Sequence, residues 1–146
     1  MDRSPPPAYR NRSPNEIDVS DTSLQPLRVP PDWRVDWNTL FELDPTPENV
    51  GRGFFGGSSL FAASSTSMRL AVDVEWRPED DPDGCYRLTV YYAPWIRTEN
   101  GRRRKSTPLD FSDANIVYDV ETRSRQDIVQ QIEDVLRGRD EWIEHN

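Results

Sequence analysis

Two stretches in the middle of the chain, residues 69–77 and 86–95, place an apolar side chain at every second position. A period of two indicates strands of an antiparallel sheet that bury one face. The segment between them, Pro78–Gly84, is rich in turn-forming residues and predicts a hairpin. The predicted inward side chains are Leu70, Val72, Val74 and Trp76 in the first strand, and Tyr86, Leu88, Val90 and Tyr92 in the second.

Further strands are predicted on both sides of this hairpin. Asn100-Gly101 is a strong turn signal, because both residues accept a positive φ. It predicts a second hairpin with arms at residues 91–97 and 103–111. The remaining candidates are strands at residues 37–43 and 115–120, and residues 58–66, which fit either a strand or a short helix.

The C-terminal part carries a helical pattern, with an apolar stripe at Ile128, Val129, Ile132, Val135 and Leu136. Ser124 and Asp127 resemble a capping box, and Gly138 suits a helix C-terminus. We expect residues 139–144 to add a last turn that returns Trp142 and Ile143 to the core. The predicted fold class is α+β: an antiparallel meander of about five strands with one C-terminal helix packed on one face.

The composition changes near residue 32. Residues 1–31 hold seven of the 13 prolines and only scattered aliphatic residues. Such a segment buries too little apolar surface to offset its ordering entropy. We therefore expect a disordered Pro-rich tail at residues 1–32 and a single domain at 33–146. An alternative is that the part near Ile17, Val19 and Leu24 lies along the body as an edge strand.

Charge and composition exclude several classes of protein. The 146 residues include 26 acidic and 18 basic side chains, for a net charge of −8, with one Cys and one His. A single cysteine excludes an intramolecular disulfide and a Cys-based zinc site. Neither a membrane-spanning apolar run nor a signal-peptide core is visible, so we expect a cytoplasmic protein.

Three motifs suggest ligands but lack the context that those ligands need. Gly51–Gly56 matches GxGxxG without the strand and helix of a dinucleotide fold. Glu79–Gly84 partly imitates a calcium loop, but its twelfth position is Val90, where a glutamate is required. Arg102–Lys105 is basic within an acidic chain. We expect no cofactor and no metal, and we do not expect nucleic-acid binding.

Catalytic chemistry is poorly supplied. His145 is the penultimate residue, which does not suit a histidine general base. Cys85 has acidic neighbours, whereas a reactive thiol needs an electropositive setting. Asp73 and Glu75 share the outward face of one strand, with Arg87 expected opposite, which is an ordinary cross-strand arrangement. The sequence therefore predicts that the protein is not an enzyme.

A small acidic domain without catalytic groups is expected to work by binding, and its charge favours a basic protein partner. An intracellular inhibitor such as a bacterial toxin-immunity protein has this size and charge. The alternative is a structural module that self-associates, as a homodimer, through a sheet edge, with Trp95 and Trp142 at the interface. The candidate partner-binding residues are Asp80, Asp81 and Asp83 on the hairpin tip, Tyr91, and Phe54 and Phe55 in the glycine loop if they are exposed.

Overall fold

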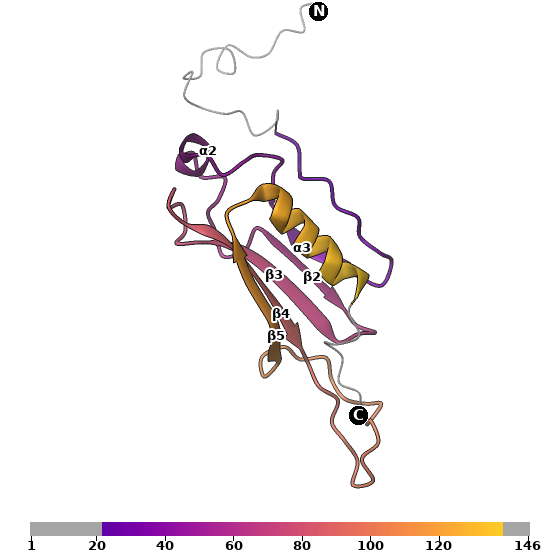
Figure 1. Cartoon of the computed structure of the whole chain (residues 1–146). Helices are drawn as coiled ribbons and strands as arrows, with labels where there is room; N and C mark the ends of the chain where they lie inside the picture. The colour runs from indigo at the N-terminus through magenta and orange to yellow at the C-terminus, as the bar shows by residue number, and fades with distance from the viewer. Residues whose placement is uncertain (1–21, 139–146) are drawn as a thin grey trace, which may run out of the picture.

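The computed structural model describes residues 22–138 and contains a five-stranded antiparallel sheet with one long helix on one of its faces (Figure 1). Each strand pairs with the next one along the chain. The predicted α+β meander with a C-terminal helix is therefore confirmed. Its strands are β1 (Arg34–Asn38), β2 (Phe61–Ser65), β3 (Leu70–Arg77), β4 (Cys85–Tyr92) and β5 (Asn115–Thr122).

The predicted central hairpin is formed by β3 and β4, whose ladder runs from Leu70↔Tyr92 to Arg77↔Cys85. Every second side chain of β3 is buried, as the period of two predicts. The indole nitrogen of Trp76 donates to the carbonyl oxygen of Asp81 at 2.8 Å, which ties the connecting loop to the sheet.

The helix α3 (Arg125–Arg137) begins and ends where the sequence predicts. The Ser124 hydroxyl accepts a hydrogen bond from the Asp127 amide at 3.1 Å, so it is the N-cap. Gly138 follows with a φ of 83°, which glycine adopts without strain. The predicted last turn, with Trp142 and Ile143, lies outside the described residues.

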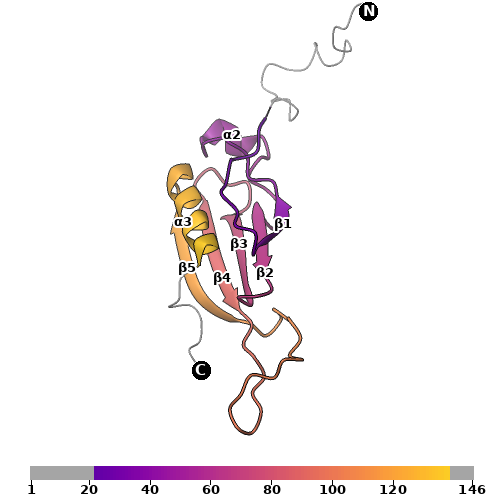
Figure 2. The same ribbon diagram turned by 90° about the vertical axis from the view of Figure 1, so that its right-hand side faces the viewer.

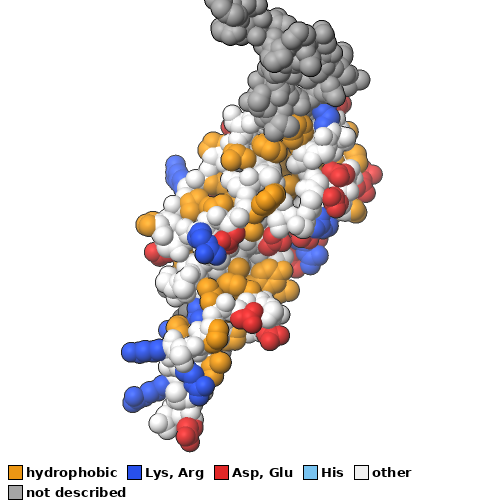
Figure 3. All heavy atoms as spheres, turned by 180° about the vertical axis from the view of Figure 1, so that it is seen from behind, with side chains coloured by type: hydrophobic (Ala, Val, Ile, Leu, Met, Phe, Trp, Pro, Cys, Tyr) orange, Lys and Arg blue, Asp and Glu red, His pale blue; other side chains and the backbone are white. Residues whose placement is uncertain are grey.

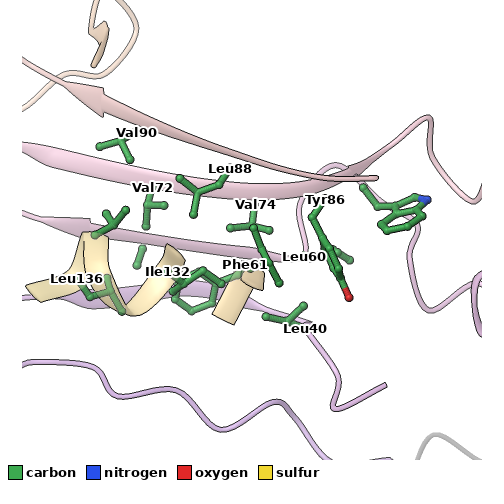
Figure 4. Packing of buried hydrophobic residues seen from close by; sticks show 14 of the residues in the cluster. Leu40, Leu60, Phe61, Val72, Val74, Tyr86, Leu88, Val90, Ile132 and Leu136 are labelled. Atoms are coloured by element: carbon green, nitrogen blue, oxygen red, sulfur yellow. The ribbon is translucent and has the colours of Figure 1, made fainter. Parts of the chain in front are cut away.

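The core lies between the sheet and α3. Figure 4 shows side chains of β3 and β4 pointing towards Ile132 and Leu136 of the helix. Each fully buried aliphatic side chain contributes about 1.5–3 kcal/mol, so this layer is the main source of stability. The buried positions that the two strands supply are Leu70, Val72, Val74, Trp76, Tyr86, Leu88, Val90 and Tyr92.

A second covering element was not predicted. Residues 22–33 run beside α3 over the same face of the sheet (Figure 2). The Arg28 amide donates to the Glu133 carboxylate at 2.9 Å, and Trp33 is buried in the core. Leu24 forms one isolated β-bridge with Phe41 and belongs to none of the five strands, so this residue lies along the body but not as part of an edge strand. Residues 22–32 thus make contacts with the body, and the domain boundary at residue 32 stays a prediction. The predicted tail before Thr22 and the Ile17 and Val19 alternative lie outside the described residues.

Strand boundaries near the edge β1 differ from the prediction of residues 37–43. The side-chain oxygen of Asn38 accepts from the Leu40 amide at 3.0 Å, and this local turn ends the strand at Asn38. The ambiguous residues 58–66 contain the strand β2. A short helix α2 (Pro47–Gly51), capped by Thr46, was not predicted.

The second predicted hairpin does not form a ladder. Residues 93–114, which we call the protruding loop, extend beyond the sheet and contain a single bridge, Arg97↔Arg103 (Figure 2). Pro94 and Pro108 have no N–H to donate, and a turn joins the Arg104 carbonyl to the Thr107 amide at 2.9 Å. The arms 91–97 and 103–111 are therefore wrong as strands beyond Tyr92.

Arg69 anchors this loop to the body. Its side chain is buried, and it donates to the carbonyl oxygens of Ala93 at 2.6 Å and Pro108 at 2.7 Å. The guanidinium carbon also lies 4.5 Å from the ring centre of Trp95. No helix between residues 22 and 138 is long and apolar enough to cross a membrane.

Candidate binding face

The face of the sheet opposite α3, which we call the open face, carries no helix in the described part of the chain (Figure 2). Its residues on the edge strands β1 and β5 are mostly exposed, those on β2 and β3 are half-buried, and Thr89 of β4 is buried. Two large apolar side chains stand on it: Trp37 is 54% exposed and Ile116 is 59% exposed. Trp37 lies on the edge strand β1 and Ile116 on the opposite edge strand β5, so they are two separate apolar side chains among polar neighbours. The residues of this face are Arg34, Asp36, Trp37, Ala62, Ser64, Ala71, Asp73, Glu75, Arg77, Cys85, Arg87, Thr89, Tyr91, Ile116, Asp119 and Glu121.

A hollow of about 400 Å³ opens on this face. Small side chains of β2 and β3, Ala62 and Ala71, allow it to form, because a larger residue at either position would fill it. Tyr91 of β4 lines it as well, and Leu109 and Phe111 reach it from the protruding loop. The volume falls within the range of about 300–1,000 Å³ that is usual for ligand sites.

Three charged residues line the hollow: Arg34, Asp36 and Asp73. Asp36 accepts from the Arg34 guanidinium at 2.6 Å and from the Ser64 hydroxyl at 2.8 Å. Asp73 accepts from the Ser59 hydroxyl at 2.5 Å. Within residues 22–138, Asp73 forms no ion pair with a lysine or arginine. It is thus a partly buried charge that lacks a countercharge there.

Glu75 lies on the same face as Asp73, two residues along β3. Burial raises the pKa of the Glu75 carboxyl, Arg77 at 3.2 Å opposes this shift, and the nearby Asp73 raises the pKa further. Its cross-strand neighbour is Arg87, as the sequence predicts. Arg87 itself pairs with Asp119 of β5 at 3.2 Å. The carboxylates outnumber the cations along this row, so the row carries net negative charge.

Tyr91 is the sequence-predicted contact residue that belongs to this face. Its side chain is half-buried and lines the hollow. Burial raises the pKa of the Tyr91 hydroxyl, and the Asp73 and Glu75 charges raise it further. The hydroxyl therefore stays protonated near neutral pH and is available as a hydrogen-bond donor.

The acidic hairpin tip with Asp80, Asp81 and Asp83 lies at the other end of β4 from Tyr91. Six strand positions separate Tyr91 from Cys85, a distance of about 20 Å. The Asp81 carboxylate accepts from the Asp83 amide at 2.9 Å, so part of its hydrogen-bonding capacity is used within the loop. The structure therefore places the predicted acidic residues and Tyr91 in two separate regions.

The two phenylalanines of the glycine loop are not equivalent. Phe55 is 4% exposed and packs against Trp76 with ring centres 5.1 Å apart, so it belongs to the core. The sequence offered Phe55 as a contact residue only if its ring is exposed, and this condition is not met. Phe54 is half-buried and stacks edge-on against Phe41 at 5.5 Å.

The glycine motif and Cys85 lie in surroundings that do not suit nucleotide binding or thiol chemistry. Gly51 ends the helix α2, whereas a nucleotide-binding loop would follow a strand and open a helix. Burial raises the pKa of the Cys85 thiol, and Glu121 raises it further, so the thiol form is favoured. Within residues 22–138, no group of three or more His, Cys, Asp or Glu side chains is arranged to hold a metal ion. His145 is outside this range.

The basic cluster lies at the far end of the protruding loop, where Lys and Arg side chains stand out from the lower end of the molecule (Figure 3). Arg102, Arg103, Arg104 and Lys105 are all exposed. Arg103 lies with its guanidinium carbon 5.6 Å from the ring centre of Trp95. The positive charge is thus separated from the acidic open face.

Sequence reasoning missed the residues that shape the hollow. Ala62, Ala71, Leu109 and Phe111 carry no motif, and they come from segments far apart in the chain. Trp37 fell within a predicted strand, but neither its face nor its exposure followed from the pattern. The small outward-facing residues Ala62 and Ala71 of neighbouring strands could have indicated the hollow, because small side chains leave space on the surface of a sheet.

No family model matches the chain, and no curated protein and no solved structure shows significant similarity to it. What the protein does is therefore inferred from its surface and its chemistry.

Proposed function

We propose that the protein is a non-enzymatic binding protein that holds a basic protein partner against the open face, in the manner of an intracellular inhibitor such as a toxin-immunity protein. The observation that carries this proposal is the exposed Trp37 on the same face as a hollow lined by Asp73, whose carboxylate has no ion-pair partner among residues 22–138.

The residue types on this face support a protein interface. Tryptophan and tyrosine are enriched among the residues that dominate binding energy, because they bury a large area and offer one polar group. Trp37 and Tyr91 supply such side chains, and the surrounding carboxylates favour a partner with complementary positive charge. The open face thus replaces the acidic hairpin tip as the main candidate surface.

The proposal is tested by capturing partners from a native lysate, at low and at high salt, with the full chain immobilised as bait. The captured protein is then purified, and its affinity for the chain is measured by titration. Trp37→Ala should weaken its binding at least tenfold, because Trp37 is an exposed apolar anchor. The matched control is Val29→Ala, an exposed apolar residue (38%) on the layer that covers the opposite face. It should leave the affinity within twofold.

Capture of a basic protein that depends on Trp37 but not on Val29, and that weakens with salt, supports the proposal. Equal binding by both variants overturns the assignment of the open face. A bait that captures nothing at either salt concentration, while circular dichroism shows it folded, counts against the inhibitor class.

The second candidate is self-association through a sheet edge. It is favoured by β5, an eight-residue strand whose outer edge is not paired with any strand in the described part of the chain. Trp95, which the sequence suggested for this interface, is instead stacked against Arg69, and Trp142 lies beyond the described residues. A concentration-independent monomer in light scattering would count against this candidate.

A further inference from the structure

We infer that the hollow is a receptor for a single arginine side chain of the partner. This inference rests on the proposed function and names the chemistry by which the open face selects its partner. It places one guanidinium group next to Asp73, between the side chains that line the hollow.

The electrostatics of the hollow call for a cation. Asp73 and Glu75 are neighbouring carboxylates on β3. Burial raises the pKa of Glu75, Arg77 lowers it, and both the charge of Asp73 and a side-chain hydrogen bond with Asp73 raise it. Asp73 has a hydroxyl donor in Ser59 but no countercharge among residues 22–138. Arg34 and Asp36, which also line the hollow, already pair with each other at 2.6 Å, so Asp73 is the lining carboxylate that a partner cation would neutralise. A guanidinium beside Asp73 would form the missing ion pair, whereas an anion would meet the carboxylates of Asp36 and Asp73.

The walls favour arginine over a small inorganic cation. Tyr91 and Phe111 line the hollow with aromatic rings, Leu109 adds an aliphatic wall, and Ala62 and Ala71 leave room for the stem of a long side chain. A guanidinium is planar and weakly hydrated, and it combines stacking on aromatic rings with a two-pronged bond to a carboxylate. A lysine ammonium satisfies the charge but is more strongly hydrated and lacks the planar fork.

The hollow is also placed where a partner side chain can reach it. It lies between β1 and the protruding loop, on the same face as the exposed indole of Trp37. The Trp37 ring nitrogen donates to the Ser59 carbonyl at 3.0 Å, and the Ser59 hydroxyl donates to Asp73. Ser59 therefore connects the apolar anchor of the face to the charge within the hollow.

The test is an NMR titration of the full-length ¹⁵N-labelled chain with N-acetylarginine amide, which requires no knowledge of the partner. N-acetylcitrulline amide has nearly the same shape without the charge and is the control ligand. We expect saturable shifts for the arginine compound at millimolar concentration, largest at the amides of Ala71, Asp73 and Tyr91. The citrulline compound should bind at least tenfold more weakly, and a lysine analogue should fall between the two.

Two substitutions localise the binding. Asp73→Asn removes the charge while keeping an acceptor for the Ser59 hydroxyl, and Ala71→Leu fills the hollow without changing its charge. Each substitution should lower the affinity for N-acetylarginine amide at least fivefold. Glu42→Gln removes an exposed acidic residue outside the open face and should change the affinity less than twofold.

The proposal that the hollow binds an arginine side chain would be overturned if the citrulline compound caused equal shifts. It would also be overturned if the shifts with the arginine compound survived both substitutions. This failure is distinct from failure of the proposed function, because the open face can still bind a partner that depends on Trp37. Conversely, loss of the Trp37 dependence with an intact arginine response would leave a cation-binding hollow and remove the interface proposed around it.

Discussion

At the scale of single residues, Arg69 shows how one side chain organises a long loop. It has a φ of 56°, is 4% exposed, and points its guanidinium into a set of backbone carbonyl oxygens. A buried charge is costly unless it is fully hydrogen-bonded. The carbonyl oxygens of residues 93, 94, 107 and 108 accept these hydrogen bonds, which hold the first residues of the protruding loop and its returning part against the body.

Arg69→Ala should therefore lower the free energy of unfolding by about 2–4 kcal/mol, since it leaves several carbonyls without their donor. Arg69→Lys should recover only part of this loss, because an ammonium cannot reach carbonyls on both sides of the loop. Urea denaturation measures the change. Arg102→Ala, at an exposed position of the same loop, is the control and should stay within about 0.5 kcal/mol. A loss below 1 kcal/mol for Arg69→Ala would contradict the anchoring role.

At the scale of elements, the sequence predicted strands and helices reliably where the apolar positions keep one period along the whole element. The β3–β4 hairpin and α3 are formed by segments whose apolar positions match a period of two or of 3.6, so the sequence predicted them closely. Short elements without such repeats were predicted poorly: β1 is displaced towards the N-terminus, and α2 has only one turn and one buried residue, Val50.

The N-cap of α3 gives a test at this scale. Ser124→Ala should lower the free energy of unfolding by about 1 kcal/mol, because the Asp127 amide loses its acceptor at the start of the helix. Thermal and chemical denaturation followed by circular dichroism measure the loss. Ser124→Asp restores an acceptor and should recover most of the stability. If alanine and aspartate behaved alike, the capping bond would not contribute to stability.

At the scale of the whole molecule, the two faces of the sheet differ in how they are covered. One face is buried by α3 together with residues 22–33, and the open face keeps its aromatic and charged residues in contact with solvent (Figure 2). Net negative charge on the open face and exposed cations on the protruding loop lie in different regions. Such separation steers a charged partner towards one orientation.

Residues 22–32 are expected to be part of the folded unit. A chain that begins at Trp33 loses the Arg28–Glu133 and Gln25–Arg125 hydrogen bonds and the packing of Leu27 on the core, so it should be less stable by at least about 2 kcal/mol. A chain that begins at Thr22 keeps these contacts and is the matched reference. Differential scanning calorimetry compares the two. Equal melting temperatures would show that these contacts add nothing to stability.

The sequence by itself determined the fold class, the central hairpin and the C-terminal helix, because periodicity, turns and caps act between residues that are close along the chain. It also indicated that Tyr91 faces away from the core. Tertiary structure decided the burial of residues 22–33, the course of the protruding loop and the existence of the hollow. The residues around the hollow range from Arg34 to Phe111, and only strand pairing in space brings their side chains together.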